Sequence, residues 1–485
     1  MSRPSTLDGR SDSLVSGDRG LPAILVGSAT TSAPAGAEAL RHWLAERDRD
    51  STMTVSRADL ADLRDWHDEQ VIRHRTGRFF TVEGLDVRVE GGGVGHWRQP
   101  IICQFEIGVL GILAACVDGV QRFLMQAKAE PGNPRGHQLS PTVQATRSNF
   151  TRAHGGRSVP YLRYFVDAEV DRVLVDVLQS EQGSWFLRKR NRNMVVEVDP
   201  GIEVLEGFRW CTLAEIHAAL AVEDLVNMDA RTVLSCLPFH GSGLLHGLDG
   251  FADDFTGALV RSLAGTHGGV HHLGEILGAV TAARAEAAIK AERVPLAGLP
   301  AWHRRDGAIT HESGAFFDVI GVDVKADGRE VGEWSQPMFA ARGVGLVCFL
   351  VTVLDGVLHV LVQLRREPGF LDTVELAPTV QCTPSTYERL PELAKPPFLD
   401  VVSGADPSAF RFDTVMSEEG GRFHHTRTRY VVLEVDDVLE RPGFHWMTVD
   451  QLTSLLRHSH YVDVQARSLL PCLQALACGR AARTA

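Results

Sequence analysis

The chain contains one sequence pattern twice. Asp118-Gly119 returns as Asp355-Gly356, 237 residues later. A register held over a whole repeat indicates a tandem duplication, and the residues that differ between the copies provide an internal comparison. Further motifs keep this offset, or 236 after one deletion: Glu130-Pro131-Gly132 with Glu367-Pro368-Gly369, Pro141-Thr142-Val143-Gln144 with Pro378-Thr379-Val380-Gln381, Ser180-Glu181 with Ser417-Glu418, and Phe208 and Trp210 with Phe444 and Trp446.

Length and charge limit the possible partners. With 485 residues the chain is long enough for two domains with proper cores. A net charge of −12 argues against general binding of nucleic acid or anionic membranes, which need a basic field. No run of about 18 apolar residues predicts a membrane span. The N-terminus lacks a signal-peptide core, so a cytoplasmic location is the default expectation, and residues 1–35 are expected to be disordered.

A β-hairpin is predicted at the centre of each repeat. Apolar, β-branched runs flank Asp118-Gly119 and Asp355-Gly356, and Asp-Gly favours a tight turn because Gly tolerates positive φ. Apolar spacing predicts helix over residues 36–75. Two further strands, a closing helix and a last apolar segment follow the hairpin: Val173–Leu178, Met194–Val198, Leu213–Ala221 and Ala230–Leu237 in the first repeat, with the helix Val449–Leu456 and the segment Ala466–Leu473 in the second.

These elements predict an α+β chain made of two similar domains with mixed sheets. The first repeat is expected over residues 36–245 and the second over 295–478. Between them, helix-compatible spacing over Phe251–Leu263 and Leu273–Arg293 predicts a helical linker covering residues 246–294.

Two polar segments of the first repeat are candidates for a functional site. One begins on the strand that ends at Lys128 and continues through a loop to Asn149. Loops that emerge from sheet ends are where sites are usually built. The other contains Arg188, Lys189, Arg190 and Arg192. On a strand the three arginines share one face, which favours an anionic partner such as a diphosphate, with a solvated edge strand defended by charge as the alternative.

Several familiar signatures are missing. No Gly-x-Gly-x-x-Gly follows a strand, so a dinucleotide cofactor is not expected. A Gly-Lys-Ser/Thr phosphate loop and a nucleophile elbow are also missing. The eight cysteines are scattered without zinc spacing, and neither His271-His272 nor His424-His425 has a pattern that favours a metal. Neither metal nor cofactor is therefore predicted.

The longest motifs resemble the NDP-hexose 2,3-dehydratases of deoxysugar biosynthesis. The similar segments cover Gln126 to Asn133, Gln138 to Gln144, Gln179 to Gly183, Arg188 to Asn193, and Val226 to Arg231. The resemblance extends over roughly residues 40–475 and includes the duplication.

The resemblance implies a substrate, a fold and partners. The substrate is dTDP-4-keto-6-deoxy-glucose, the reaction is loss of the C2 hydroxyl, and a 3-ketoreductase consumes the product on the way to an antibiotic or other glycan. Each repeat resembles a Nudix domain, and members form homodimers. The Arg-Glu-x-x-Glu-Glu helix of Nudix hydrolases is missing after both Gly132 and Gly369, which argues against metal-dependent pyrophosphate cleavage.

The chemistry requires a base at C3, stabilisation of an oxyanion at O4, and a proton for the leaving C2 hydroxyl. The candidate acids and bases are Lys128, Glu130, Glu181, His137 and Tyr161. Arg147, Arg188, Lys189, Arg190 and Arg192 are expected to hold the diphosphate, and Trp97 or Trp185 to stack on thymine. The remaining binding candidates are Gln99, Thr142, Gln144, Asn149, Ser180 and Gln182.

Comparison of the copies favours the first repeat as the catalytic one. Lys128 becomes Arg365, and the Arg188-Lys189-Arg190 cluster becomes His425-Thr426-Arg427. The second copy is expected to hold a structural or secondary pocket made of Trp334, Glu367, Thr379, Gln381, Glu418 and Arg429. Two other functions remain open: a non-catalytic sugar-nucleotide binding protein, and a degenerate Nudix phosphohydrolase.

Overall fold

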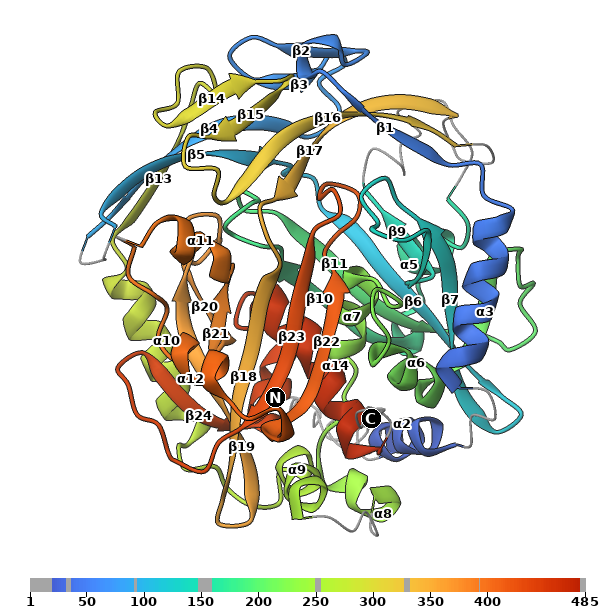
Figure 1. The fold of residues 1–485 in the computed structure, drawn as a ribbon. Helices are drawn as coiled ribbons and strands as arrows, with labels where there is room; N and C mark the ends of the chain where they lie inside the picture. Colours follow the sequence, from blue (N-terminus) through green and yellow to red (C-terminus); the bar gives the residue numbers. More distant parts are fainter. Residues whose placement is uncertain are drawn as a thin grey trace, which may run out of the picture.

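The computed structural model describes residues 20–31, 36–90, 94–146, 159–248, 254–326, 332–391 and 393–479. In this part of the chain, two similar halves each contain a mixed inner sheet and a smaller antiparallel outer sheet. The outer sheets lie together at the top of the view in Figure 1, and helices pack against the inner sheets below them. The expected pair of similar α+β repeats with mixed sheets is confirmed.

The two inner sheets have the same topology. The first runs β10-β11-β6-β7-β12, with β8 on β7 and β9 on β6, and the second runs β22-β23-β18-β19-β24, with β20 on β19 and β21 on β18. One pair in each sheet is parallel, β11 with β6 and β23 with β18. The first-repeat strands are β6 (Gly108–Val117), β7 (Val120–Ala129), β8 (His137–Ser140), β9 (Val143–Ala145), β10 (Val173–Ser180), β11 (Arg190–Glu197) and β12 (Phe208–Thr212); those of the second are β18 (Gly345–Leu354), β19 (Val357–Arg366), β20 (Val374–Pro378), β21 (Val380–Cys382), β22 (Phe410–Ser417), β23 (Arg427–Glu434) and β24 (Phe444–Thr448).

Both predicted hairpins are present. Val117 pairs with Val120 across Asp118-Gly119, and Leu354 pairs with Val357 across Asp355-Gly356. All four turn residues have positive φ, between 49° and 77°, as a two-residue type I′ turn requires.

Capped helices close each repeat. Thr212 and Glu215 form a capping box on α6 (Leu213–Leu220), and Thr448 and Gln451 form the same box on α13 (Val449–Ser454). These helices agree with the sequence prediction. The last apolar segments are helices α7 (Met228–Ser235) and α14 (Val464–Ala477), whose N-caps are Asn227 and Asp463.

The segment expected to be a linker contains counterparts of the first helices of the chain. The bounds of α10 (Leu273–Glu286) are those of α3 (Gly36–Arg49) shifted by 237 residues. Ser28 of α2 (Gly20–Thr30) accepts a hydrogen bond from the amide of Leu213, and Ser262 of α9 (Asp254–Ala264) accepts the equivalent bond from Val449. The shorter helices are α5 (Arg163–Val166), α8 (Leu245–Leu248), α11 (Pro384–Arg389) and α12 (Leu399–Gly404).

The outer sheets exchange one strand between the repeats. Strand β1 (Thr54–Ala58), from the first repeat, pairs with β16 (Phe317–Lys325) of the second. In return, β13 (Ile289–Val294) pairs with β4 (Thr81–Val89) of the first. The outer sheets are completed by β2 (Trp66–Asp68), β3 (Ile72–His74) and β5 (His96–Cys103), and by β14 (Trp302–Arg305), β15 (Ala308–His311) and β17 (Glu333–Ala341).

Three sequence predictions are wrong in part. The helix predicted over residues 36–75 ends at Arg49. The rest of that range forms β1, β2, β3 and a 3-10 turn over Leu60–Asp62. Leu60 and Leu63 are buried, but they belong to short separate elements and not to one face of a helix. Helix over Leu273–Arg293 ends at Glu286, because β13 follows. Disorder over 1–35 is wrong for residues 20–30, whose Leu25 and Val26 are buried in the main core.

The main core belongs to both repeats. One continuous apolar cluster includes Phe123 of β7, Phe349 of β18, Leu234 of α7 and Leu469 of α14, each at most 1% exposed. Within the described ranges, every helix is too short or too polar to span a bilayer.

Candidate active site

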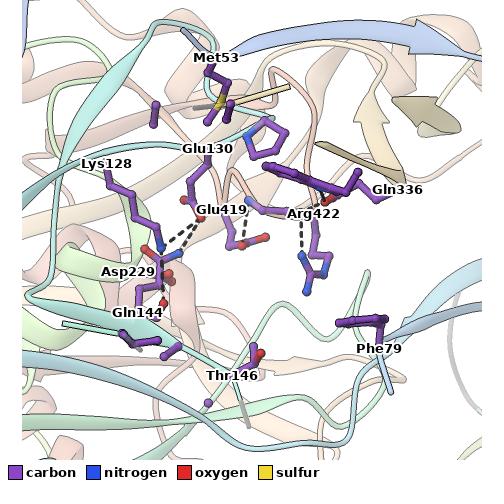
Figure 2. Close-up of a pocket in the computed structure, with 18 of the residues that line it drawn as sticks. Met53, Phe79, Lys128, Glu130, Gln144, Thr146, Asp229, Gln336, Glu419 and Arg422 are labelled. Carbon is purple, nitrogen blue, oxygen red and sulfur yellow. Dashed lines mark hydrogen bonds and ion pairs between the residues drawn. The ribbon is translucent and has the colours of Figure 1, made fainter. Parts of the chain in front are cut away.

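A cavity of about 1100 Å³ lies beside the first inner sheet. Its walls come from β7, β9, β11 and the start of α7 in the first repeat, and from β17 and the loop after β22 in the second. Figure 2 shows Lys128, Glu130, Gln144 and Asp229 gathered close to Glu419 and Arg422. The cavity is therefore built by both repeats.

The end of β7 provides a lysine and a carboxylate. Lys128 Nζ lies 3.6 Å from Glu130 Oε1, and the Gln144 side-chain amide donates to the same oxygen at 3.0 Å. The side chains of Lys128 and Glu130 are 15% and 8% exposed. These two contacts hold the Glu130 carboxyl in the cavity wall, beside a cation and an amide donor.

Two further carboxyls are buried in the wall. Asp229, in the first turn of α7, is 4% exposed, and burial raises its pKa well above its usual range, with the Glu181, Glu419 and Glu130 carboxyls adding to the rise. Burial also raises the pKa of Glu181, which accepts a hydrogen bond from Asn191 at 2.6 Å. Both carboxyls therefore keep a proton to a higher pH than an exposed carboxyl does, which suits a wall that donates protons.

Lys189 brings a second ammonium group to the cavity. It is 5% exposed and donates to the Glu106 carbonyl at 2.8 Å. Burial lowers its pKa to about 8, although the Glu181 carboxyl opposes the shift.

The loop after β22 supplies Glu419 and Arg422. The Gly421 amide donates to Glu419 Oε1 at 2.9 Å, and Arg422 lies over the Phe80 ring at 4.2 Å. Burial raises the pKa of Glu419 to about 7, and the Glu130 carboxylate contributes to the rise. Burial lowers the pKa of Arg422.

Close backbone contact holds this loop on the first repeat. The Gly132 amide donates to the Gly420 carbonyl, and the His425 amide donates to the Gly132 carbonyl, both at 2.8 Å. A Cβ on Gly132 would lie 1.8 Å from the Phe423 carbonyl oxygen, so only glycine permits this approach. The Glu-Pro-Gly turn of the first repeat thus binds the Ser-Glu loop of the second.

The reverse contact is also present. The Gly369 amide donates to the Gly183 carbonyl at 2.8 Å, and the Arg188 amide donates to the Gly369 carbonyl at 2.7 Å. Two buried arginines form a second pair of reciprocal contacts between the repeats. Arg231 donates to the Ser417 carbonyl, and Arg467 donates to the Ser180 carbonyl. The two repeats are therefore related by reciprocal contacts.

Part of the cavity wall is aromatic. Phe79 and Phe80 follow the short strand that ends at His74, and Trp334 comes from β17 of the other repeat. Phe80 is buried beneath Arg422, whereas Phe79 and Trp334 are half-buried, and flat, half-buried rings suit stacking against a planar base.

Seven of the site residues predicted in the first repeat line the cavity: Lys128, Glu130, His137, Thr142, Gln144, Glu181 and Lys189. Two of them have clear structural partners. His137 Nδ1 lies 2.7 Å from Asp48, and the Thr142 hydroxyl accepts from the Leu113 amide at 2.9 Å while donating to the Leu124 carbonyl.

Other predicted residues lie outside the cavity walls. Tyr161 donates to the Glu203 carbonyl at 2.8 Å, Ser180 donates to Glu375 at 2.6 Å, and the Gln182 amide donates to Glu418 at 2.5 Å. Trp97 and Gln99 bond to each other at 2.9 Å. Arg147 and Asn149 lie outside the described residues.

The predicted aromatic and basic groups are arranged differently from expectation. Trp185 packs in a cluster with Phe317, Phe339 and Phe423, its ring centroid 4.5 Å from that of Phe423. Strand β11 begins at Arg190 rather than Trp185, Arg188 is exposed with φ of 52°, and Arg192 pairs with Asp176 at 2.5 Å. The cavity wall contains Lys189 and Asn191, and does not contain Arg188, Arg190 or Arg192.

The residues expected to form a second-repeat pocket have different surroundings. Trp334 lines the cavity of the first repeat. Glu367 pairs with Arg365 at 2.7 Å, Glu418 accepts from the Tyr430 hydroxyl at 3.0 Å, and Arg429 pairs with Asp413 at 2.7 Å. Thr379 links β18 to β19 by hydrogen bonds, as Thr142 links β6 to β7. The backbone carbonyl of Gln381 accepts a hydrogen bond from Arg365.

Sequence reasoning missed Asp229, Glu419, Arg422 and Gln336 as cavity residues. The duplication carried a signal for three of them. Asp229, Glu419 and Arg422 stand where the other copy has Gln465, Gln182 and Trp185.

Comparison with known proteins identifies the family. A family model described as NDP-hexose 2,3-dehydratase matches residues 37–237 and again 273–473. The chain belongs to this family. The two matches also reproduce the duplication, and the second begins at the first residue of α10.

Family members of established name are similar over almost the whole chain. A protein from Amycolatopsis orientalis is 46% identical over 91% of this chain and 90% of its own length. Relatives from Saccharopolyspora spinosa and Streptomyces violaceoruber are 48% and 46% identical over 90% of the chain, and 90% and 96% of their own lengths. All three are named dTDP-4-dehydro-6-deoxy-alpha-D-glucopyranose 2,3-dehydratase.

Proposed function

We propose that this chain removes the C2 hydroxyl of dTDP-4-dehydro-6-deoxy-α-D-glucopyranose as a hydro-lyase of deoxysugar biosynthesis. The observation that carries the proposal is the near full-length similarity to three proteins of that name. The cavity supports it, because carboxyl and ammonium groups lie together there, as an elimination beside a ketone requires.

The reaction divides into two proton transfers. A base removes the proton at C3, and the electrons move toward the C4 ketone as an oxyanion develops at O4. The C2–O bond then breaks with a proton donated to the leaving hydroxyl, which departs as water. The enol that remains at C3 tautomerises to a 3,4-diketo-2,6-dideoxy sugar, so the net change is loss of one water.

Glu130 is the group best placed to act as the base. Its carboxyl is held in the cavity by Lys128 and by the Gln144 amide, which lie 3.6 and 3.0 Å from Oε1. Lys128, Lys189 and Arg422 supply the positive charge that an oxyanion or a diphosphate needs. The earlier hypothesis of one catalytic site, in the first repeat, is retained, with walls completed by the second.

Other expectations remain proposals. The mixed inner sheet flanked by helices supports a Nudix-like repeat. The start of the second family match at residue 273 supports a second repeat that includes α10. A homodimer, a downstream 3-ketoreductase and a role in antibiotic biosynthesis rest on the sequence resemblance. A cytoplasmic location is proposed as the default location.

The test is to incubate purified protein with the 4-keto sugar nucleotide and follow its mass. We expect loss of one water from the sugar. Binding without a change of mass would support the sugar-nucleotide binding protein instead. Release of nucleoside monophosphate that depends on magnesium would support the phosphohydrolase.

A further inference from the structure

Glu419 reaches the cavity from the second repeat, and one of its oxygens has no partner. Oε1 accepts from the Gly421 amide, but Oε2 is buried and makes no hydrogen bond within the described part of the chain. A buried carboxyl oxygen without a partner is costly unless the group is protonated or meets a ligand.

Its position beside Glu130 is fixed by the contact between the two loops. A Cβ on Gly420, the next residue, would lie 3.0 Å from the Glu130 Cβ and 2.2 Å from Asn133 Oδ1. The Glu130 and Glu419 side chains lie close together in the cavity (Figure 2), and like charges repel each other in a poorly solvated site. Glu130 is paired with the Lys128 ammonium and the Gln144 amide, whereas Glu419 Oε2 makes no hydrogen bond within the described residues, and a proton on that oxygen lets it donate to a ligand.

The other copy lacks this group. The repeat-equivalent residue is Gln182, whose amide donates to Glu418 at 2.5 Å. Next to it, Trp185 takes the position of Arg422 and fills an aromatic cluster. At this position the loop of the second repeat therefore places a carboxylic acid against the first repeat, and the loop of the first repeat places a neutral amide against the second.

We propose that Glu419, supplied by the second repeat, is the catalytic acid that donates the proton to the departing C2 hydroxyl. This inference rests on the proposed function. Glu130 takes the C3 proton, Glu419 gives its own proton to the hydroxyl oxygen, and water leaves as the C2–O bond breaks. The two carboxyls end with exchanged protonation, and tautomerisation restores them: C2 takes the proton from Glu130, and the C3 enol hydroxyl releases its proton, which returns to Glu419 through solvent.

The test separates the two proton transfers. Wild type and Glu419→Gln are incubated in D2O with dTDP-4-dehydro-6-deoxy-glucose, and mass spectrometry follows deuterium entry at C3 and loss of water. We expect the variant to lose water at least about 100-fold more slowly. Deuterium entry at C3 should continue, because the base is intact and the oxyanion can only return to the ketone.

Glu375→Gln provides a matched control for replacing a buried carboxyl. Glu375 is fully buried, outside the cavity wall, and bonded to Ser180 of the other repeat. The first repeat has Gln138 at the equivalent position, bonded to Ser417. This variant should keep both exchange and water loss.

Three results would overturn the assignment in an active wild-type protein. In the first, Glu419→Gln loses exchange and elimination together. In the second, it keeps both. In the third, Asp229→Asn, rather than Glu419→Gln, separates exchange from elimination. A wild-type protein that loses no water would instead reject the proposed function itself.

Discussion

Lys128 and Arg365 occupy the same position in the two repeats but have different surroundings. Lys128 lines the cavity beside Glu130, whereas Arg365 forms a tight pair with Glu367, whose side chain is only 3% exposed. One cation is available to a ligand, and the other neutralises a buried charge. Substitution at this shared position should therefore affect activity in the first repeat and stability in the second.

Replacing each cation with alanine should separate these effects. Lys128→Ala is expected to slow turnover by roughly 100-fold or more with little loss of stability, because a cation near the reacting groups is removed. Arg365→Ala should lower unfolding stability by about 3–5 kcal/mol, because Glu367 is left buried without its partner. Turnover of folded protein and thermal unfolding are the two measurements. An Arg365→Ala variant that is stable but inactive, beside an active Lys128→Ala, would move the catalytic site to the second repeat.

Part of the cavity wall could be predicted from the residue types at the ends of the first-repeat strands. Lys128, Glu130, Glu181 and Lys189 could be found because motif and strand position place them at a sheet end. Glu419 could not be placed in the same way, since its role depends on how the repeats pack. The alternation of a strand divides Arg188 to Arg192 between two faces but does not say which face is inside. The packing of the two repeats places Lys189 in the cavity wall.

At the scale of elements, the hairpins were predictable and the exchanged strands were not. Asp118-Gly119 specifies its turn locally through backbone conformation. Strands β1 and β13 have no local signal for their partners, because each pairs with the other repeat. The three-residue spacing of Leu60, Leu63 and Trp66 matched a helix, although these residues belong to separate short elements.

The Glu-Pro-Gly turn gives a prediction at this scale. Gly132→Ala should lower stability by about 1–3 kcal/mol, because its Cβ meets the Phe423 carbonyl. It should also slow turnover strongly, since the clash displaces the loop that carries Glu419. Turnover is compared at a temperature where every variant is folded.

Two glycines serve as controls for that substitution. Gly369→Ala introduces the equivalent clash with the Phe186 carbonyl, at 2.0 Å, and should destabilise while affecting turnover less. Gly201→Ala has open space around its Cβ and should change neither property. Equal losses of turnover in Gly132→Ala and Gly369→Ala would show that the first turn has no special link to the site.

For the whole molecule, the shared core predicts a single unfolding event. The main apolar cluster contains side chains from both inner sheets, and each outer sheet includes a strand of the other repeat. Neither half can unfold without exposing the core of its neighbour. Scanning calorimetry should show one transition whose calorimetric and van't Hoff enthalpies agree. Two separate transitions would mean that the repeats are independent domains.

The exchange of β1 and β13 has an evolutionary consequence. Once each copy of the duplicated gene segment had lent a strand to the other, deletion of either copy would have left a sheet incomplete. The second copy could then lose its own cations and acquire Glu419 under selection for the first copy's pocket. The second copy is thus indispensable through the strand it provides, whether or not its own pocket has any chemistry to perform, and its buried loop after β22 forms part of a neighbour's cavity.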